Sequence, residues 1–263
     1  MSILGSSLDI DRTDIRWLLD DLRRRRGMAN LGRPYTHKEL AGLAMLSPHY
    51  LGKLLRGNRP VTQSALQLLG RALGIPPEVQ TALLQAERRR TTASEYTPAT
   101  PTRREVSEVE PVPYAAMLVT RGCFDISYVN SSCTAMLPGL IEHRNVLKWL
   151  ALEPAARAVL GDAWLPITTF FVASFHFYLP TVASDTKRRT ILAALVTMKE
   201  LDSMWDAPYP AENDVPEKFW LKDIATGSST PTAFNLLKWE YPKGDQLRIS
   251  FPPVDEEVPA NAG

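Results

Sequence analysis

Residues 36–57 constrain the fold of this chain more than any other stretch, because they encode two short helices and a tight corner between them. Thr36 can cap the first helix, and Glu39 three residues later completes a capping box. Ser47 can cap the second helix, with Pro48 in its first turn, where a missing N–H costs nothing. Gly57 suits the left-handed turn that ends such a helix.

Apolar residues in this stretch fall where two crossed helices would bury them, and they are Leu40, Ala41, Ala44, Leu51, Leu54 and Leu55. The spacing gives each helix one inner face. The layout is that of a helix-turn-helix, whose second helix enters the major groove of DNA. The alternative is a helical hairpin without any role in nucleic-acid binding.

This stretch resembles the XRE-type (Cro/C1-like) helix-turn-helix regulators. Their pattern T-Q-x-E-L-A-x-x-A-G-V-S-x-x-x-I-S-x-L-E-x-G runs here without a gap. Three positions depart from it: His37 replaces Gln, Met45 replaces the corner Gly, and Leu55 replaces a Glu that commonly pairs with a basic residue of the first helix. The matching residues are Thr36, Glu39, Leu40, Ala41, Ala44, Ser47, Leu51, Leu54 and Gly57.

The outward face of the second helix supplies the candidate DNA contacts. His49 and Lys53 can bond to a guanine edge, directly or through water, whereas Tyr50 is better suited to phosphate or sugar. The polar loop that follows suits the DNA backbone, and the amide groups where the first helix starts could hold a phosphate. The predicted DNA-binding residues are Thr36, His37, Ser47, Pro48, His49, Tyr50, Lys53, Arg56, Asn58 and Arg59.

Charge is distributed unevenly along a chain whose net charge is only +1. Residues 1–90 hold 15 Lys and Arg against 8 Asp and Glu, and residues 91–263 hold 15 against 21. A basic first part on an acidic remainder concentrates positive potential where phosphates would lie. The four arginines at 23–26 either compensate a helix dipole at its carboxyl end or steer phosphates, and both roles are compatible.

Periodicity predicts three more helices, which complete an all-α five-helix domain over residues 1–90. They cover residues 11–28, residues 62–73, and a segment that starts at Pro76 and Pro77. The intervening segment 27–35 is rich in Gly and Pro, so we expect a mobile loop there.

The rest of the chain divides by composition. Residues 91–113 are Thr, Ser, Glu and Arg with four prolines, which predicts a semi-extended, exposed linker. Residues 114–253 are long enough for a core of their own, and residues 254–263 read as a flexible acidic tail.

The second domain reads as α+β, with strands at both ends and helices between them, an order typical of sensor folds that also fits other α+β layouts. We expect strands at 115–120, 124–129, 234–241 and 247–251, and helices at 131–137, 145–152, from Pro154 onward and at 186–205.

The run of residues 145–157 resembles the N-x-L-[KR]-x-L-x-L-x-P-x-A-R signature of the MmyB-like regulator domain. Residues 124–130, Trp164 and the pair Met204 and Trp205 also match that family. The resemblance implies a PAS-like sensor joined to a DNA reader, with an apolar pocket for a fatty-acyl-like ligand. Such regulators are common in actinobacteria and often serve antibiotic metabolism. After residue 165 the match weakens, and the family's His-Pro-x-x-Gly motif is missing, so ligand identity transfers least.

Residues 163–184 contain no charged side chain and several aromatic ones. Their length would allow a membrane span, but Pro166, Pro180 and His176 argue against one. The first ten residues also lack the pattern of a signal peptide. The aromatic residues could wall a ligand cavity, form a dimer seam or pack as ordinary core. The predicted ligand-binding residues are Leu118, Phe124, Ile126, Phe170, Phe171 and Trp205.

Enzyme chemistry finds little support in the sequence. Cys123 and Cys133 lack metal-ligand spacing and read as reduced thiols, while His143 and His176 have no nucleophile motif nearby. No glycine-rich phosphate loop occurs. We therefore predict a protein that is not an enzyme and uses no cofactor or metal.

Together these patterns predict a cytoplasmic transcriptional regulator that binds double-stranded DNA as a homodimer, with two recognition helices roughly 34 Å apart. A fatty-acyl-like or other apolar small molecule would shift its operator affinity. The alternative is a DNA-binding protein whose C-terminal domain is a ligand-free dimerisation or docking module. A sealed cavity would favour the first, and an exposed apolar patch the second.

Overall fold

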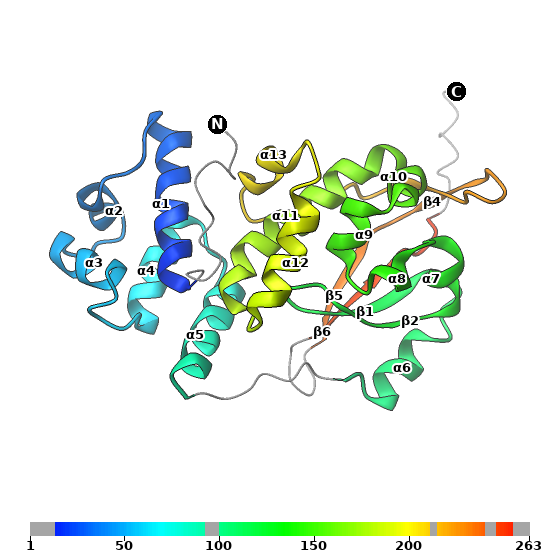
Figure 1. Cartoon of the computed structure of the whole chain (residues 1–263), viewed down its shortest axis with the longest axis horizontal. Coiled ribbons are helices and arrows are strands. Elements are labelled where there is room, and N and C mark those ends of the chain that lie inside the picture. Colours follow the sequence, from blue (N-terminus) through cyan, green and yellow to red (C-terminus); the bar gives the residue numbers. More distant parts are fainter. Residues whose placement is uncertain (1–13, 93–99, 211–214, 240–245, 255–263) are drawn as a thin grey trace, which may run out of the picture. The chain divides into compact units, whose positions relative to one another are not determined.

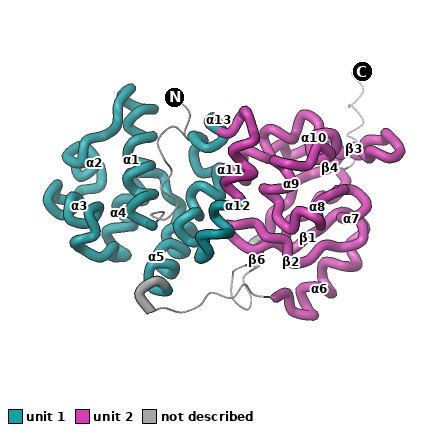
Figure 2. The backbone as a smooth tube through the Cα atoms, in the orientation of Figure 1, with its two compact units in different colours: residues 1–96, 173–190, 202–209 teal, residues 97–172, 191–201, 210–263 magenta. Residues whose placement is uncertain are grey.

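The computed structural model describes residues 14–92, 100–210, 215–239 and 246–254 (Figure 1). The chain forms two compact units, and neither is one continuous segment (Figure 2). Unit 1 holds residues 1–96, 173–190 and 202–209, and unit 2 holds residues 97–172, 191–201 and 210–263. The first is built from helices, whereas the second combines helices with antiparallel sheets.

The five predicted helices of the N-terminal part are all present. Four of them begin directly after a side-chain cap, because Asp14, Thr36, Ser47 and Thr62 each accept a backbone N–H of the following turn. The caps at Thr36 and Ser47 were predicted, whereas α1 starts four residues later than predicted. Their bounds are α1 Ile15–Leu31, α2 His37–Leu43, α3 Pro48–Leu55, α4 Gln63–Leu73 and α5 Pro77–Thr92.

The predicted loop at 27–35 is wrong in its first part, because α1 continues to Leu31 before Gly32 ends it in a left-handed conformation. Gly27 lies inside the helix and is buried. A Cβ atom on Gly27 would clash with the backbone of Pro34 and Tyr35. This glycine therefore serves close approach of the returning chain and does not break the helix.

Unit 1 has one hydrophobic core, and that core draws on distant parts of the chain. Leu18, Leu40 and Leu66 are among its members from α1, α2 and α4. Phe177 and Tyr178 belong to the same core, although they lie at the end of α11 (Trp164–Tyr178). Helix α11 starts in unit 2 and ends in unit 1, so a single helix contributes to both.

Unit 2 contains a four-stranded antiparallel sheet in the order β2-β1-β6-β5, so strands from the start and the end of the unit are neighbours. Met117 of β1 pairs with Val129 on one side and with Ile249 on the other. The strands are β1 Ala116–Thr120, β2 Ile126–Val129, β5 Asn235–Trp239 and β6 Gln246–Ser250, and a separate hairpin, which we did not predict, pairs β3 Phe219–Lys222 with β4 Ser229–Thr232.

Most helices of unit 2 lie between β2 and β3 in sequence, as expected, and α6 (Arg103–Val109) precedes β1. The helices between β2 and β3 include α7 Ser131–Met136, α8 Leu140–His143, α9 Val146–Leu152, α10 Pro154–Leu160 and the first part of α11. Helix α6 overturns the expectation of an extended, exposed linker for its residues. Thr102 and Glu105 form a capping box, and Val109 is fully buried against Ala116 and Leu118.

The single helix predicted over residues 186–205 is wrong, because two helices occupy it. Helix α12 spans Asp185–Leu195 and α13 spans Leu201–Trp205. Between them the Thr197 hydroxyl donates to the Ala194 carbonyl oxygen, and Met198 N–H donates to Leu195. The Thr197 side chain thus bonds a carbonyl oxygen of the last turn of α12, where the helix ends.

Asn130 ties three segments of unit 2 together and is fully buried. Its Oδ1 atom accepts from the N–H groups of Ala116 and Cys133, and so caps α7 and holds the start of β1. Its Nδ2 atom donates to the carbonyl oxygens of Val112 and Tyr114. One side chain thus fixes a helix, a strand and the connection from α6.

Among the described residues, one helical run is long and apolar enough to cross a membrane, and it is Pro154–Thr181. Of its most apolar stretch, 67% is buried inside the protein. Such burial fits a helix packed in a protein core.

Candidate nucleic-acid interface

The start of α2 is fixed by the predicted capping box. Thr36 Oγ1 accepts the Glu39 N–H at 3.2 Å, and the Glu39 carboxylate accepts the Thr36 N–H at 2.7 Å. Arg33 donates to both carboxylate oxygens, which, with Thr36, lowers the pKa of Glu39 to about 2. The prediction that a phosphate binds the Thr36 and Glu39 N–H groups is therefore wrong. The capping box already uses both groups and places a negative charge beside them.

Met45 forms the corner between α2 and α3 in a left-handed conformation, with φ of 52°. It stands where the XRE-type pattern has Gly, which adopts this conformation without a steric cost. The Met45 side chain is 77% exposed, so packing recovers little of that cost. The corner is thus formed despite an unsuitable residue, since α2 and α3 pack against the common core through Leu40, Leu51 and Leu54.

Met45→Gly should stabilise the protein by about 0.5–1 kcal/mol, because it relieves the left-handed strain and glycine's larger unfolded entropy offsets only part of the gain. The urea unfolding midpoint of the full chain measures this. As the matched control, Gly57→Ala at a φ of 80° should shift the midpoint the opposite way. A lower midpoint for Met45→Gly would contradict the strain argument.

Ser47 caps helix α3, because its Oγ accepts the Tyr50 N–H at 3.1 Å, and Pro48 is the first residue of the helix. Leu51 and Leu54 point into the core, and Leu55 is half-buried against it. The opposite face is left to polar side chains. The amphipathic reading of this helix is confirmed, and it determines which side chains can reach a partner.

The structure leaves every predicted DNA-binding residue accessible. Tyr50 and Lys53 are half-buried, because they flank the inner face of α3. The other eight are exposed, and they are Thr36, His37, Ser47, Pro48, His49, Arg56, Asn58 and Arg59. The set runs from the start of α2 along α3 into the following loop.

Cationic side chains cluster at the carboxyl end of α3. Within the described part of the chain, the structure gives no ion pair for Lys53, Arg56 or Arg59. The Arg59 guanidinium lies 5.4 Å from the centre of the Tyr50 ring, in cation–π range. Their positive charge is therefore not neutralised by a carboxylate of the described residues, as a phosphate-binding surface requires.

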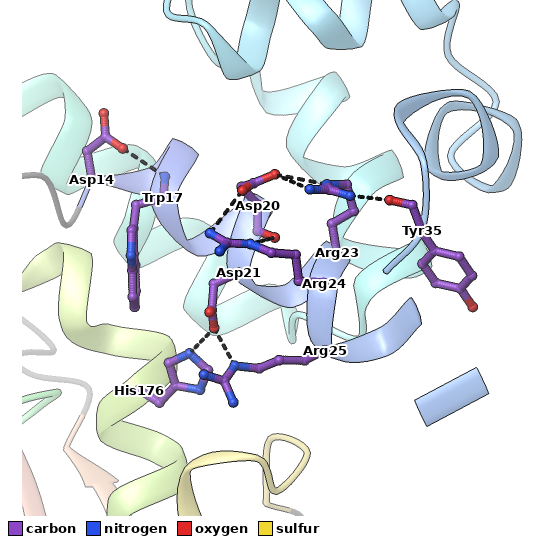
Figure 3. A network of polar contacts seen from close by, with 9 residues as sticks. All are labelled: Asp14, Trp17, Asp20, Asp21, Arg23, Arg24, Arg25, Tyr35 and His176. Atoms are coloured by element: carbon purple, nitrogen blue, oxygen red, sulfur yellow. Dashed lines mark hydrogen bonds and ion pairs between the residues drawn. The ribbon is translucent and has the colours of Figure 1, made fainter. Parts of the chain in front are cut away.

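The four arginines at 23–26 behave differently from the prediction. They lie mid-way along α1, whose last turn holds no basic residue, so the helix-dipole role is wrong. Arg23 and Arg24 both pair with Asp20, and Arg25 pairs with Asp21 (Figure 3). Carboxylates thus offset much of the charge that phosphate steering would use.

Lys38 was missed by the sequence analysis. It is exposed directly after His37, and the described residues include no ion-pair partner for it. The sequence could have identified Lys38 as exposed, because it lies between the Thr36 cap and Glu39. Residues at these positions must face solvent on a helix that buries Leu40 and Ala41.

The predicted ligand-binding residues do not form one site. Phe171 meets Phe124 and Phe170 edge to face, with ring centres 5.0 and 5.5 Å apart, and Phe234 joins them. Leu118 instead packs with Val109 of α6. Side chains alternate along β1, so the residues next to Leu118 point to the opposite face of the sheet. Ile126 is half-buried on edge strand β2, and Trp205 belongs to unit 1, where its ring stacks on His176.

The two thiols lie in different surroundings. Burial raises the pKa of Cys133 to about 12, so this thiol stays protonated at neutral pH. Cys123 lies within the β1–β2 hairpin, 3.0 Å from the Thr120 hydroxyl. No group of three or more His, Cys, Asp or Glu side chains able to hold a metal occurs in the described ranges.

Comparison with known proteins adds no family assignment: no family model matches the sequence, and a search of curated proteins finds no match.

Proposed function

We propose that this protein is a sequence-specific, DNA-binding transcriptional regulator of the XRE type, which reads the major groove with α3. The observation that carries the proposal is the exposed face of α3. His49 and Lys53 lie where a recognition helix presents side chains to base edges, and Arg56 and Arg59 follow where it meets phosphates. His49 and Lys53 lie on a capped helix that packs on the common core, and Arg56 and Arg59 lie in the turn directly after it.

A homodimer is part of the proposal, because one short helix reads too few base pairs for a specific site. Two copies of α3 would lie roughly 34 Å apart and read the two halves of a palindromic operator. Helix α3 carries no carboxylate side chain, which supports its role in DNA binding, since an unpaired acidic group there would repel the phosphate backbone of DNA.

The C-terminal part is proposed to act as a PAS-like, MmyB-like sensor of a fatty-acyl-like or other apolar ligand in the cytoplasm, in control of antibiotic or secondary metabolism. The antiparallel sheet, which joins strands from both ends of unit 2 with helices between, supports the sensor fold. The ring-on-ring packing of Phe124, Phe170 and Phe171 favours the alternative, a ligand-free dimerisation or docking module.

The recognition helix is tested by binding to DNA. After an operator is selected from a randomised duplex library, His49→Ala and Lys53→Ala should each cost about 1–3 kcal/mol on that operator and relax preference at one or two positions. Arg59→Ala should weaken binding to all duplexes alike and reduce the salt dependence of the affinity.

Fluorescence anisotropy at fixed salt measures these affinities, with Lys222→Ala, an exposed change in β3 of unit 2, as the control. If both α3 variants keep the original site preference, the assignment of α3 is lost. Native mass spectrometry with organic extraction tests the sensor separately: a stoichiometric lipid supports it, and a clean apo mass that no added acyl compound shifts supports the docking module.

A further inference from the structure

His176 is a buried titratable group that the proposed DNA contacts do not use. It lies near the end of α11, 1% exposed, inside unit 1. Its Nε2 atom is 2.9 Å from Oδ2 of Asp21, which lies on α1 (Figure 3). A polar contact thus joins the helix that arrives from unit 2 to the first helix of the DNA-reading part.

Aromatic rings enclose the imidazole. The Trp205 ring of α13 stacks on it, with centres 4.6 Å apart and an angle of 25°. Trp17 of α1 meets it edge-on at 6.0 Å, and Phe177 lies at 5.6 Å. Water therefore has little access to His176 while α1, α11 and α13 stay packed together.

The charged groups that face His176 come from α1 and from the end of α13. Arg25 Nε donates to the same Asp21 oxygen at 2.6 Å, and Arg25 also pairs with Asp206. Asp21 is thereby shared between His176 and Arg25, and Arg25 links Asp21 to Asp206. One carboxylate therefore faces the ring directly, with one guanidinium beside it.

The protonation states follow from this arrangement. Burial lowers the pKa of His176, and the Arg25 charge lowers it further, which outweighs the opposing effect of Asp21. Burial alone would raise the pKa of Asp21, but the bonds from His176 and Arg25 lower it below the ordinary value. At neutral pH a neutral imidazole donates from Nε2 to an ionised carboxylate.

The direction of the pH effect is then fixed. An exposed histidine binds a proton below about pH 6.5, whereas His176 resists it until a lower pH. Between those two pH values, a form of the protein with His176 exposed to water binds more protons than the packed form. The packed form therefore loses stability as the pH falls. Asp21 acts in the same direction, but only near pH 4 and below.

We propose that the end of α11 and helix α13 form a proton-sensitive lock on α1, which opens when His176 takes up a proton from solvent. The proton adds to Nδ1, and the imidazolium is better hydrated once α11 and α13 move away from α1. If the proposed function holds, this deepens it, because the lock acts on the core that supports α2 and α3 and would make operator affinity depend on pH.

Amide hydrogen exchange of the full chain tests the lock without DNA, so its outcome is independent of the proposed function. Protection factors are compared at pH 6.5 and 5.5 for peptides from α1, from residues 173–178 and from α13. In the natural protein they should fall by about fivefold across this interval, because an exposed histidine is about half protonated at pH 6.5 and almost fully protonated at pH 5.5. In His176→Gln, which keeps a donor and cannot titrate, they should stay constant.

A matched pair tests the partner. Asp21→Asn should lower protection already at pH 7, while Asp20→Asn, a more exposed carboxylate one residue earlier, should not affect α11 or α13. An equal pH response in the natural protein and His176→Gln would overturn the lock. If His176→Gln fails to fold, an NMR titration of the His176 ring in the natural protein decides, because a pKa at or above 6.5 excludes it.

Discussion

Phe171→Ala should destabilise unit 2 by about 3–5 kcal/mol, the cost of removing a large aromatic side chain from a packed core. Phe171 is 1% exposed and touches the rings of Phe124, Phe170 and Phe234 edge to face. Such ring pairs add to the area that each side chain buries. Urea unfolding of the full chain, followed by fluorescence and circular dichroism together, measures the loss.

This experiment also separates the two readings of the aromatic residues. Leu165→Ala, an exposed change on the same helix α11, is the matched control and should cost well under 1 kcal/mol. A loss below about 1 kcal/mol for Phe171→Ala would contradict core packing. The rings would then surround space, and the apolar-ligand proposal would gain at the expense of the docking module.

Asn130→Ala should cost about 3 kcal/mol or more, although it removes only a small polar side chain. The change leaves the buried N–H groups of Ala116 and Cys133 and the part-buried carbonyl oxygens of Val112 and Tyr114 without their partner. Each unpaired buried group carries a penalty of about 1–3 kcal/mol, and partial relaxation keeps the total below their sum.

Asn235→Ala is the matched control, since this asparagine is exposed at the start of β5, and its loss should be within about 0.5 kcal/mol. Asn130→Asp should also destabilise, because it keeps the acceptor but replaces the donor with a buried charge. Near-equal unfolding midpoints for Asn130→Ala and Asn235→Ala would show that Asn130 does not hold the three segments together.

Local signals account for what the sequence predicted well. Caps at Thr36, Ser47 and Thr62 act within one turn of helix, so their residues can be read without knowledge of the rest of the chain. The same holds for Asn130 and Asn145, each of which caps the helix that follows it. The accessible face of α3 followed from these caps together with the apolar spacing.

The failures have two causes, which are local signals that were passed over and contacts between distant residues. Helix α6 had a readable capping box in Thr102 and Glu105, but the surrounding linker-like composition obscured it. The arginine pairs with Asp20 and Asp21 were also readable, because their spacing of three or four residues fits within the helix predicted over residues 11–28. Arg25, however, also pairs with Asp206 from a remote segment. No local pattern encodes such a partner.

The predicted pocket failed for a related reason. Leu118 and Phe171 are both apolar and buried, but alternation along β1 sends Leu118 toward α6. Apolar character identifies core residues without saying which face of a sheet they share. Trp205 was placed by resemblance, and it packs instead on His176 within the helical unit.

The rings of Phe177 and Tyr178 have a consequence for how this gene can change over time. They complete a core whose other members lie mostly before residue 96. A recombination event that joined the first 96 codons to an unrelated partner would deliver five helices without those two rings. The first five helices are therefore not a self-sufficient module, and we expect related genes to exchange the remaining sequence only together with the end of α11.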